Sequence, residues 1–157
     1  MEISLRETQD GDLPVFWEHL TDPEVRHMAA ATRKYHYGRG HFDRFWAKVR
    51  TDPARILRTV IADGVVAGHA VVAGPPDERE ISYTSGRSHW WGRGVASRAL
   101  AELIKLEDTR PLHATAAADN AGSIRVLEKC GFIVTEHGRS FAQARNQDID
   151  IVRLTLR

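Results

Sequence analysis

Two apolar runs on either side of an Asp63-Gly64 pair constrain the fold more than any other feature of the chain. The runs cover Ile56–Ala62 and Val65–Ala73, and Asp-Gly is a favoured two-residue turn between antiparallel strands. A further short run, Glu80–Ser85, follows a Gly-Pro-Pro-Asp turn. The sequence therefore predicts three consecutive antiparallel strands.

Helical and extended patterns cover most of the remaining chain. Phe42, Phe45, Trp46 and Val49 recur at the spacing of one helix face. Helices are expected over residues 13–20, from there to about Met28, and over His41–Val49, Gly92–Leu106 and Asn120–Cys130. Strands are expected over Ile3–Glu7, Leu112–Ala116, Phe132–His137 and Ile149–Leu156. A loop is expected over residues 29–41, and a loop or hairpin tip over Gly138–Asp148. We therefore expect an α+β fold, with helices around one mostly antiparallel sheet of about six or seven strands, in a single domain over residues 1–157.

The composition argues against several classes of protein. The formal net charge of the 157 residues is +1, which gives no electrostatic reason to expect a nucleic acid or an anionic membrane as partner. Cys130 is the single cysteine, and the histidines do not cluster at metal-ligand spacing, so no metal is expected. The N-terminus lacks the apolar core of a signal peptide, and the apolar runs fall well short of a membrane span. A cytoplasmic location is the expectation.

A glycine-containing turn precedes the longest predicted helix. The sequence from Trp91 is Trp-Gly-Arg-Gly-Val-Ala-Ser-Arg-Ala-Leu, with glycines at positions 92 and 94. The first backbone N–H groups of a helix have no partner within it and carry a partial positive charge. Because the two glycines have no side chains, a phosphate can approach the backbone closely. The segment therefore predicts a site for a diphosphate group.

A second segment, Asn-Ala-Gly-Ser-Ile-Arg-Val-Leu-Glu-Lys-Cys-Gly-Phe, runs from Asn120 to Phe132. Asn120 is a typical N-cap residue, and Gly131 is a typical helix stop. Ser123 lies one turn into this helix, on the face that it shares with Leu127.

Together these two segments resemble the GCN5-related N-acetyltransferase (GNAT) superfamily. The first is similar to its acetyl-CoA pyrophosphate loop, and the second to the helix and strand beside the pantetheine arm. The forms Trp-Gly-x-Gly and N-x-x-S-x-x-x-L-E-K-x-G-F are most similar to the RimJ/RimL branch. The resemblance implies a sheet splayed at the acetyl-CoA site and transfer of acetyl to a primary amine, either a protein N-terminus or a small molecule. Dimers are common in similar proteins, so a homodimer is one expected assembly.

The resemblance also implies roles for particular residues. The end of the strand at residues 80–85 would pair its free backbone groups with pantetheine, and the loop and both helix starts would complete the site. The expected coenzyme-binding residues are Tyr83, Thr84, Ser85, Trp91, Gly92, Arg93, Gly94, Val95, Ala96, Ser97, Asn120 and Ser123. The acceptor would be held by less patterned segments, about residues 20–50 and 138–148.

Two catalytic residues are expected. Many superfamily members have a tyrosine acid where this chain has Leu127, so Ser123 is our candidate for the hydrogen bond to the coenzyme sulfur. Glu80 lies about where other members have a glutamate base, and it would accept a proton directly or through water. Glu136 and His137 are further candidates for the base, and loss of the proton to bulk water remains open.

Two other functions compete with this one. A protein of the same fold that binds coenzyme A without turnover would act as a sensor or interaction module, and the sequence leaves this alternative open. A different nucleotide-binding domain is disfavoured, because the chain has no G-x-x-x-x-G-K-S/T motif, no third glycine at dinucleotide-binding spacing and no alternating βαβ pattern.

Overall fold

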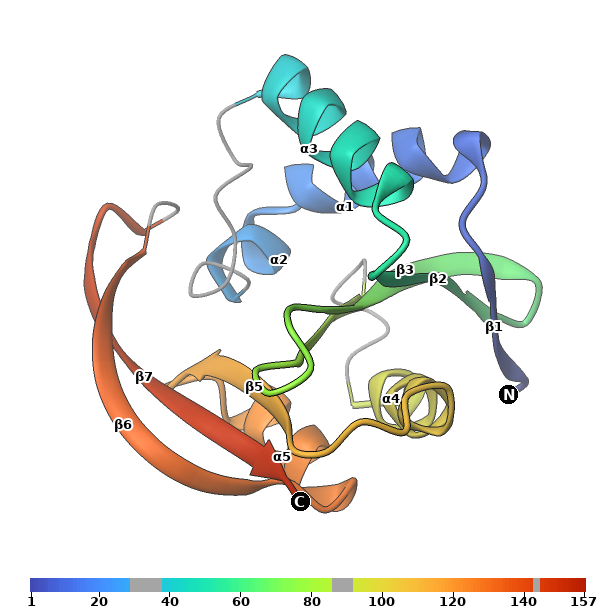
Figure 1. The fold of residues 1–157 in the computed structure, drawn as a ribbon. Coiled ribbons are helices and arrows are strands. Elements are labelled where there is room, and N and C mark those ends of the chain that lie inside the picture. The colour runs from blue at the N-terminus through green and yellow to red at the C-terminus, as the bar shows by residue number, and fades with distance from the viewer. Residues whose placement is uncertain (29–37, 86–91, 143–144) are drawn as a thin grey trace.

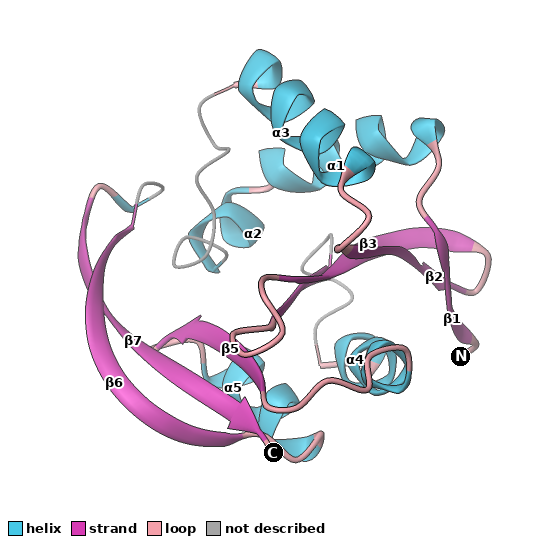
Figure 2. Ribbon diagram, viewed as in Figure 1, coloured by secondary structure: helices cyan, strands magenta, loops and turns pink. Residues whose placement is uncertain are grey.

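The computed structural model describes residues 1–28, 38–85, 92–142 and 145–157 (Figure 1). Figure 2 distinguishes the helices, strands and loops of the chain. In chain order the elements are β1 (Ile3–Glu7), η1 (Asp10–Asp12), α1 (Leu13–Thr21), α2 (Pro23–Met28), α3 (Arg39–Thr51), β2 (Ile56–Ala62), β3 (Val65–Ala73), β4 (Glu80–Ser85), α4 (Val95–Lys105), β5 (Leu112–Ala117), α5 (Ala121–Lys129), β6 (Ile133–Ala142) and β7 (Gln147–Leu156).

The strands form one seven-stranded sheet in the order β1-β2-β3-β4-β5-β7-β6. Neighbouring strands are antiparallel, except for the parallel pair β4 and β5. The turn between β2 and β3 is formed by Asp63 and Gly64, with φ angles of 49° and 81°. Positive φ at both positions is what a two-residue hairpin turn requires, and Asp-Gly supplies it at low cost. The expected α+β fold, with its mostly antiparallel sheet, is confirmed.

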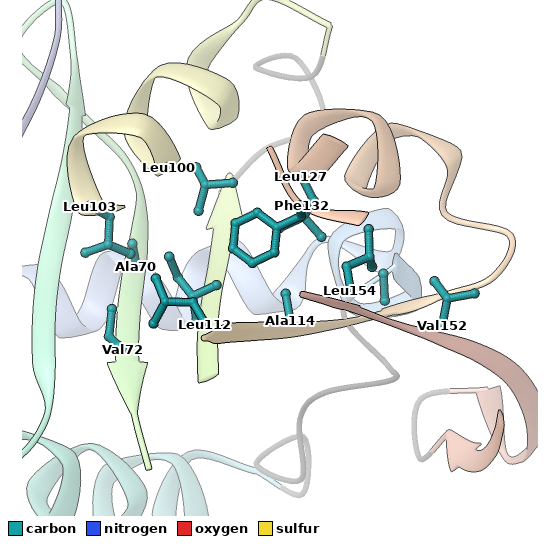
Figure 3. Close-up of a cluster of buried hydrophobic side chains, with 12 residues drawn as sticks. Ala70, Val72, Leu100, Leu103, Leu112, Ala114, Leu127, Phe132, Val152 and Leu154 are labelled. Atoms are coloured by element: carbon teal, nitrogen blue, oxygen red, sulfur yellow. The ribbon is translucent and has the colours of Figure 1, made fainter. Parts of the chain in front are cut away.

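Helices cover both faces of the sheet (Figure 1). α1, α2 and α3 lie on one face, where Phe16, Phe42 and Trp46 form a buried cluster with their neighbours. α4 and α5 lie on the other face. There Leu100, Leu127 and Phe132 belong to the largest buried cluster, which packs on the inward residues of β3, β5 and β7 (Figure 3). This core fixes α4 and α5 against the sheet.

The parallel strands β4 and β5 separate soon after they begin. Among the described residues, Glu80 and His113 are their one paired position. That end is fixed by Arg79, whose backbone oxygen accepts from His113 N at 2.9 Å and whose Nη1 donates to Gly74 O at 2.8 Å. The strands therefore diverge from a fixed end, as the resemblance implied.

The C-terminal hairpin is longer than predicted. We expected strands over Phe132–His137 and Ile149–Leu156, joined by a loop or hairpin tip over Gly138–Asp148, but β6 continues to Ala142 and β7 begins at Gln147. The predicted end of the first strand was wrong because β6 is an edge strand with most residues exposed, so it lacks the alternation of buried and polar residues that identifies a strand.

Helix starts also differ from the prediction. The helix expected from His41 begins at Arg39, and the helix expected from Gly92 begins at Val95. The loop expected over residues 29–41 lies largely in 29–37, outside the described residues.

Candidate active site

A cavity of about 570 Å³ occupies the space between the diverging strands. Successive residues of a strand point to opposite faces of a sheet. Even so, all residues from Ile81 to Thr84 on β4, and all from Ala114 to Ala117 on β5, line the cavity. The cavity therefore passes through the sheet between the two strands. The N-terminus of α4 and much of α5 line it on one face, and Val25 and Met28 of α2 line it on the other.

The start of α4 presents backbone N–H groups to this cavity. Gly92 and Gly94 have φ angles of 75° and 80°, a left-handed conformation that favours glycine. A Cβ atom at either position would meet no described atom within 4 Å, so conformation rather than crowding within the protein explains these glycines.

The first backbone bond of α4 runs from Arg98 N to Gly94 O at 3.1 Å. The N–H groups of Val95, Ala96 and Ser97 therefore precede the helical hydrogen-bond ladder, and these three residues line the cavity. Free N–H groups and the helix dipole together favour an anion at this position.

The start of α5 has the predicted cap. Asn120 Oδ1 accepts a hydrogen bond from Ser123 N at 3.1 Å, and both residues line the cavity. Leu127, one turn later, is buried in the core and also reaches the cavity. The expected capping role of Asn120 is therefore confirmed.

The hydroxyl groups of Tyr83 and Ser123 meet across the gap between β4 and α5. Tyr83 Oη lies 2.9 Å from Ser123 Oγ, a contact in which either hydroxyl can donate, and 3.3 Å from Ser123 O, which can only accept. Burial raises the pKa of Tyr83 to about 12, although the hydrogen bond with Ser123 partly opposes this rise. Tyr83 is therefore a neutral phenol at physiological pH. From the sequence we expected Tyr83 in the site, but not this side-chain contact.

The other expected coenzyme-binding residues fall into two groups. Thr84 lines the cavity, and Arg93 is exposed beside the two glycines. Ser85 ends β4, but its side chain and the whole of Trp91 lie outside the described residues.

The candidate bases lie outside the cavity. Glu80 is exposed at the closed end of the split, next to His113 and on the sheet face that it shares with Ser82 and Thr84. Glu136 and His137 are exposed on β6. None of these three residues lines the cavity.

Sequence reasoning missed several lining residues. Arg125 and Lys129 are four residues apart on α5, so they share a helix face, but it is not the face of Ser123 and Leu127 on which the prediction was based. Val25 and Met28 carry no motif and are brought to the site only by the packing of α2.

Asp119 is the one acidic residue among the described lining residues. The buried guanidinium of Arg145 donates to both of its carboxylate oxygens, at 2.7 and 3.1 Å, and to His27 O of α2 at 3.1 Å. The hydrogen bond from Arg145 lowers the pKa of Asp119. This contact ties the loop after β5 to α2.

Within the described parts of the chain, no group of three or more histidine, cysteine or acidic residues is placed to hold a metal ion. The described helices include none that is long and apolar enough to cross a membrane.

Comparisons with known proteins agree with this geometry. The profile of the family described as "Acetyltransferase (GNAT) domain" matches residues 2–133. The L-amino acid N-acetyltransferase AaaT of Escherichia coli (strain K12) is 27% identical over 124 residues, which are 69% of this chain and 72% of that protein.

Two solved structures have the same fold. Spermidine N-acetyltransferase from Vibrio cholerae, in complex with CoA and spermine, aligns with a TM-score of 0.82 and 16% identity over 98% of this chain and 94% of that one. The putative acetyltransferase yncA from Salmonella typhimurium, with its cofactor acetyl-CoA, aligns with a TM-score of 0.78 and 22% identity. The alignment covers 99% of this chain and 93% of that one. Because the family profile covers most of the sequence, the chain belongs to the GNAT acetyltransferase family.

Proposed function

We propose that this protein transfers the acetyl group of acetyl-CoA to a primary amine. The observation that carries the proposal is the cavity that passes through the sheet, with an anion-binding helix start on one face and α2 on the other. Such a cavity admits a coenzyme from one side and an acceptor from the other. The two molecules would meet between β4 and β5.

The residues present fit coenzyme A. The N–H groups at the start of α4 would hold its diphosphate, and the cationic side chains of Arg125 and Lys129 border the same cavity. The edge of β4 beyond Glu80 is not paired with β5, so its backbone groups would bind the amides of pantetheine as an added strand does. Acetyl-CoA supplies the activated thioester.

Ser123 would act at the leaving group. The amine nitrogen attacks the thioester carbonyl carbon, the carbon–sulfur bond breaks, and its electron pair passes to sulfur. The Ser123 hydroxyl would donate a hydrogen bond to that sulfur as negative charge develops. The nitrogen loses a proton in the same sequence. Glu80 lies on the acceptor face, about 6.6 Å along the strand from Ser82, so we propose that it accepts this proton through water.

We propose a small primary amine as the first acceptor class to test. The similar proteins named above act on an L-amino acid and on spermidine by their names. Membership of the RimJ/RimL branch, supported by the Trp-Gly-x-Gly and N-x-x-S-x-x-x-L-E-K-x-G-F forms, makes peptides with a free N-terminus the second class.

An acceptor screen with acetyl-CoA tests the proposal. The free thiol released would be measured across amino acids, polyamines, aminoglycosides and short peptides, with N-acetylated versions of each active compound as controls. We expect thiol release with at least one free amine and none with its acetylated form. Calorimetric binding of acetyl-CoA without release on any amine would instead support a binding module.

A further inference from the structure

The pair formed by Tyr83 and Ser123 has a consequence for how Ser123 works. Ser123 Oγ carries one hydrogen, and a serine in a helix commonly donates it to a backbone carbonyl of the preceding turn. A hydroxyl used in that way would not donate to a ligand. Ser123 can therefore assist catalysis only if its hydroxyl hydrogen points to the ligand and not to a backbone carbonyl.

Tyr83 is the described side chain whose hydroxyl is bonded to Ser123 Oγ. Its Oη has two acceptors within reach, Ser123 Oγ at 2.9 Å and Ser123 O at 3.3 Å. The shorter contact favours donation to Oγ. When Oγ accepts from Tyr83, its own hydrogen is available for a different partner, and Ser123 borders the open cavity.

We propose that Tyr83 is a positioning residue: its hydroxyl donates to Ser123 Oγ and directs the Ser123 hydrogen toward the sulfur of coenzyme A. This inference rests on the proposed function, because it requires the coenzyme sulfur to lie at Ser123. No net proton transfer from Tyr83 is involved. Both hydroxyls keep their hydrogens, and the hydrogen-bonded chain stabilises the thiolate formed when the carbon–sulfur bond breaks.

The environment of Tyr83 suits this role better than that of an acid. Burial holds the pKa of its phenol at about 12. An ordinary thiol has a pKa of about 8.5, so proton transfer from Tyr83 to the thiolate would be unfavourable by about three powers of ten. A phenol that stays protonated is a dependable hydrogen-bond donor throughout the pH range of catalysis.

A purely structural role is the competing explanation, because Tyr83 Oη also links β4 to α5 through the backbone oxygen of Ser123, at 3.3 Å. The two roles predict different effects of Tyr83→Phe on activity in a protein that already carries Ser123→Ala. A positioning residue that acts through Ser123 has nothing left to position in the Ser123→Ala protein. A structural link to the Ser123 backbone oxygen persists in Ser123→Ala, so its loss would matter equally in both proteins.

The deciding measurement is the pKa of the thiol of bound coenzyme A, read from the ultraviolet absorbance of the thiolate. It would be made on the wild type, Tyr83→Phe, Ser123→Ala and the double variant, each shown to be folded by its thermal melt. We expect the wild type to have the lowest thiol pKa. Tyr83→Phe should raise it by about half a unit or more, a roughly threefold effect on ionisation. Ser123→Ala and the double variant should give the same value.

Turnover adds a second readout. We expect Tyr83→Phe to lower kcat about five- to tenfold, with the KM for acetyl-CoA within about twofold, and to have no further effect in Ser123→Ala. Equal thiol pKa values in the wild type and Tyr83→Phe would overturn the role of Tyr83. So would an equal loss of kcat when Tyr83→Phe is made in the wild type and in Ser123→Ala. Either result would leave the proposed function standing. Failure of the wild type to bind coenzyme A would overturn the proposed function and this role with it.

Discussion

Arg79 Nε donates to Glu107 Oε1 at 2.6 Å, in an ion pair whose side chains are only 10% and 12% exposed. The pair joins the start of β4 to the segment that follows α4. Because the same arginine also holds the β3–β4 turn and the first residue pair of β4 and β5, it fixes the end from which the two strands diverge. The closed end of the split is therefore held by a residue outside the cavity lining.

Removing one partner of this pair should destabilise the fold. Glu107→Gln leaves the Arg79 guanidinium without a counter-ion, and we expect the free energy of unfolding to fall by about 2–4 kcal/mol. The matched control is Asp150→Asn, which breaks the exposed pair with Arg139 and should cost less than about 1 kcal/mol. Urea unfolding monitored by circular dichroism would measure both. Equal losses would show that the Arg79 pair has no special weight.

Acid should destabilise the protein partly through Asp12. Burial alone would raise the pKa of this carboxyl, but hydrogen bonds from Arg6, the Gln9 N–H and Thr59 lower it to about 2, against 3.8 in the unfolded chain. A lowered folded pKa gives stability that is complete above about pH 5 and is lost as the pH falls toward 2.

Asp12→Asn removes this titration. We expect the variant to lose about 1–2 kcal/mol less than the wild type between pH 5 and pH 2, although it is less stable at pH 7. Unfolding curves across that range provide the check. Parallel pH profiles for the two proteins would rule out Asp12 as the source.

Ser123→Ala should lower turnover without weakening coenzyme binding. The hydroxyl is needed only as charge develops on sulfur, so we expect kcat to fall about tenfold or more, while the KM for acetyl-CoA changes less than about twofold. The helix should be retained, because the cap uses the Ser123 backbone N–H rather than its hydroxyl. Steady-state kinetics with an acceptor from the screen tests this, and an unchanged kcat would remove Ser123 from the mechanism.

Glu80→Gln distinguishes a dedicated base from bulk water. If Glu80 accepts the amine proton through water, we expect kcat to fall about tenfold or more and the acidic limb of the pH–rate profile to move. Glu136→Gln, a change on the exposed strand β6, is the matched control and should leave both unchanged. If the pH–rate profile and kcat of Glu80→Gln match those of the wild type, the proton is accepted by solvent and not by Glu80.

The sequence predicted the local structure of the site better than its assembly. Asp63-Gly64, Gly94 and Asn120 each identify a turn or a helix end, because the backbone there needs a particular residue type, and the structure has each element near the predicted place. The contact between Tyr83 and Ser123 could not be predicted in this way. These residues are 40 positions apart, and they meet only because β4 and β5 diverge and α5 packs over the gap.

The C-terminal hairpin shows a different limit. The segment Gly138–Asp148 is mostly polar, and the prediction took this polarity as the sign of a loop or hairpin tip. An edge strand with both faces near solvent needs only backbone pairing with its neighbour, and β6 obtains this from β7. Cavity-lining residues from α2 were missed for a related reason, since packing rather than a motif brings Val25 and Met28 to the site.

The central claim is that the N–H groups at the start of α4 hold the diphosphate of coenzyme A. Ser97→Glu tests it without harming the helix, because a glutamate in the first turn suits the helix dipole while its carboxylate enters the cavity. Ala101→Glu is the matched control, since it adds the same charge at an exposed position of α4 outside the cavity lining.

Calorimetric titration of both variants with acetyl-CoA is the most direct measurement. Repulsion between a carboxylate and the diphosphate at contact distance predicts a loss of affinity of about thirtyfold or more in Ser97→Glu, and a change within about twofold in Ala101→Glu. Wild-type affinity in a folded Ser97→Glu protein would contradict the account, because the coenzyme would then bind somewhere other than the start of α4.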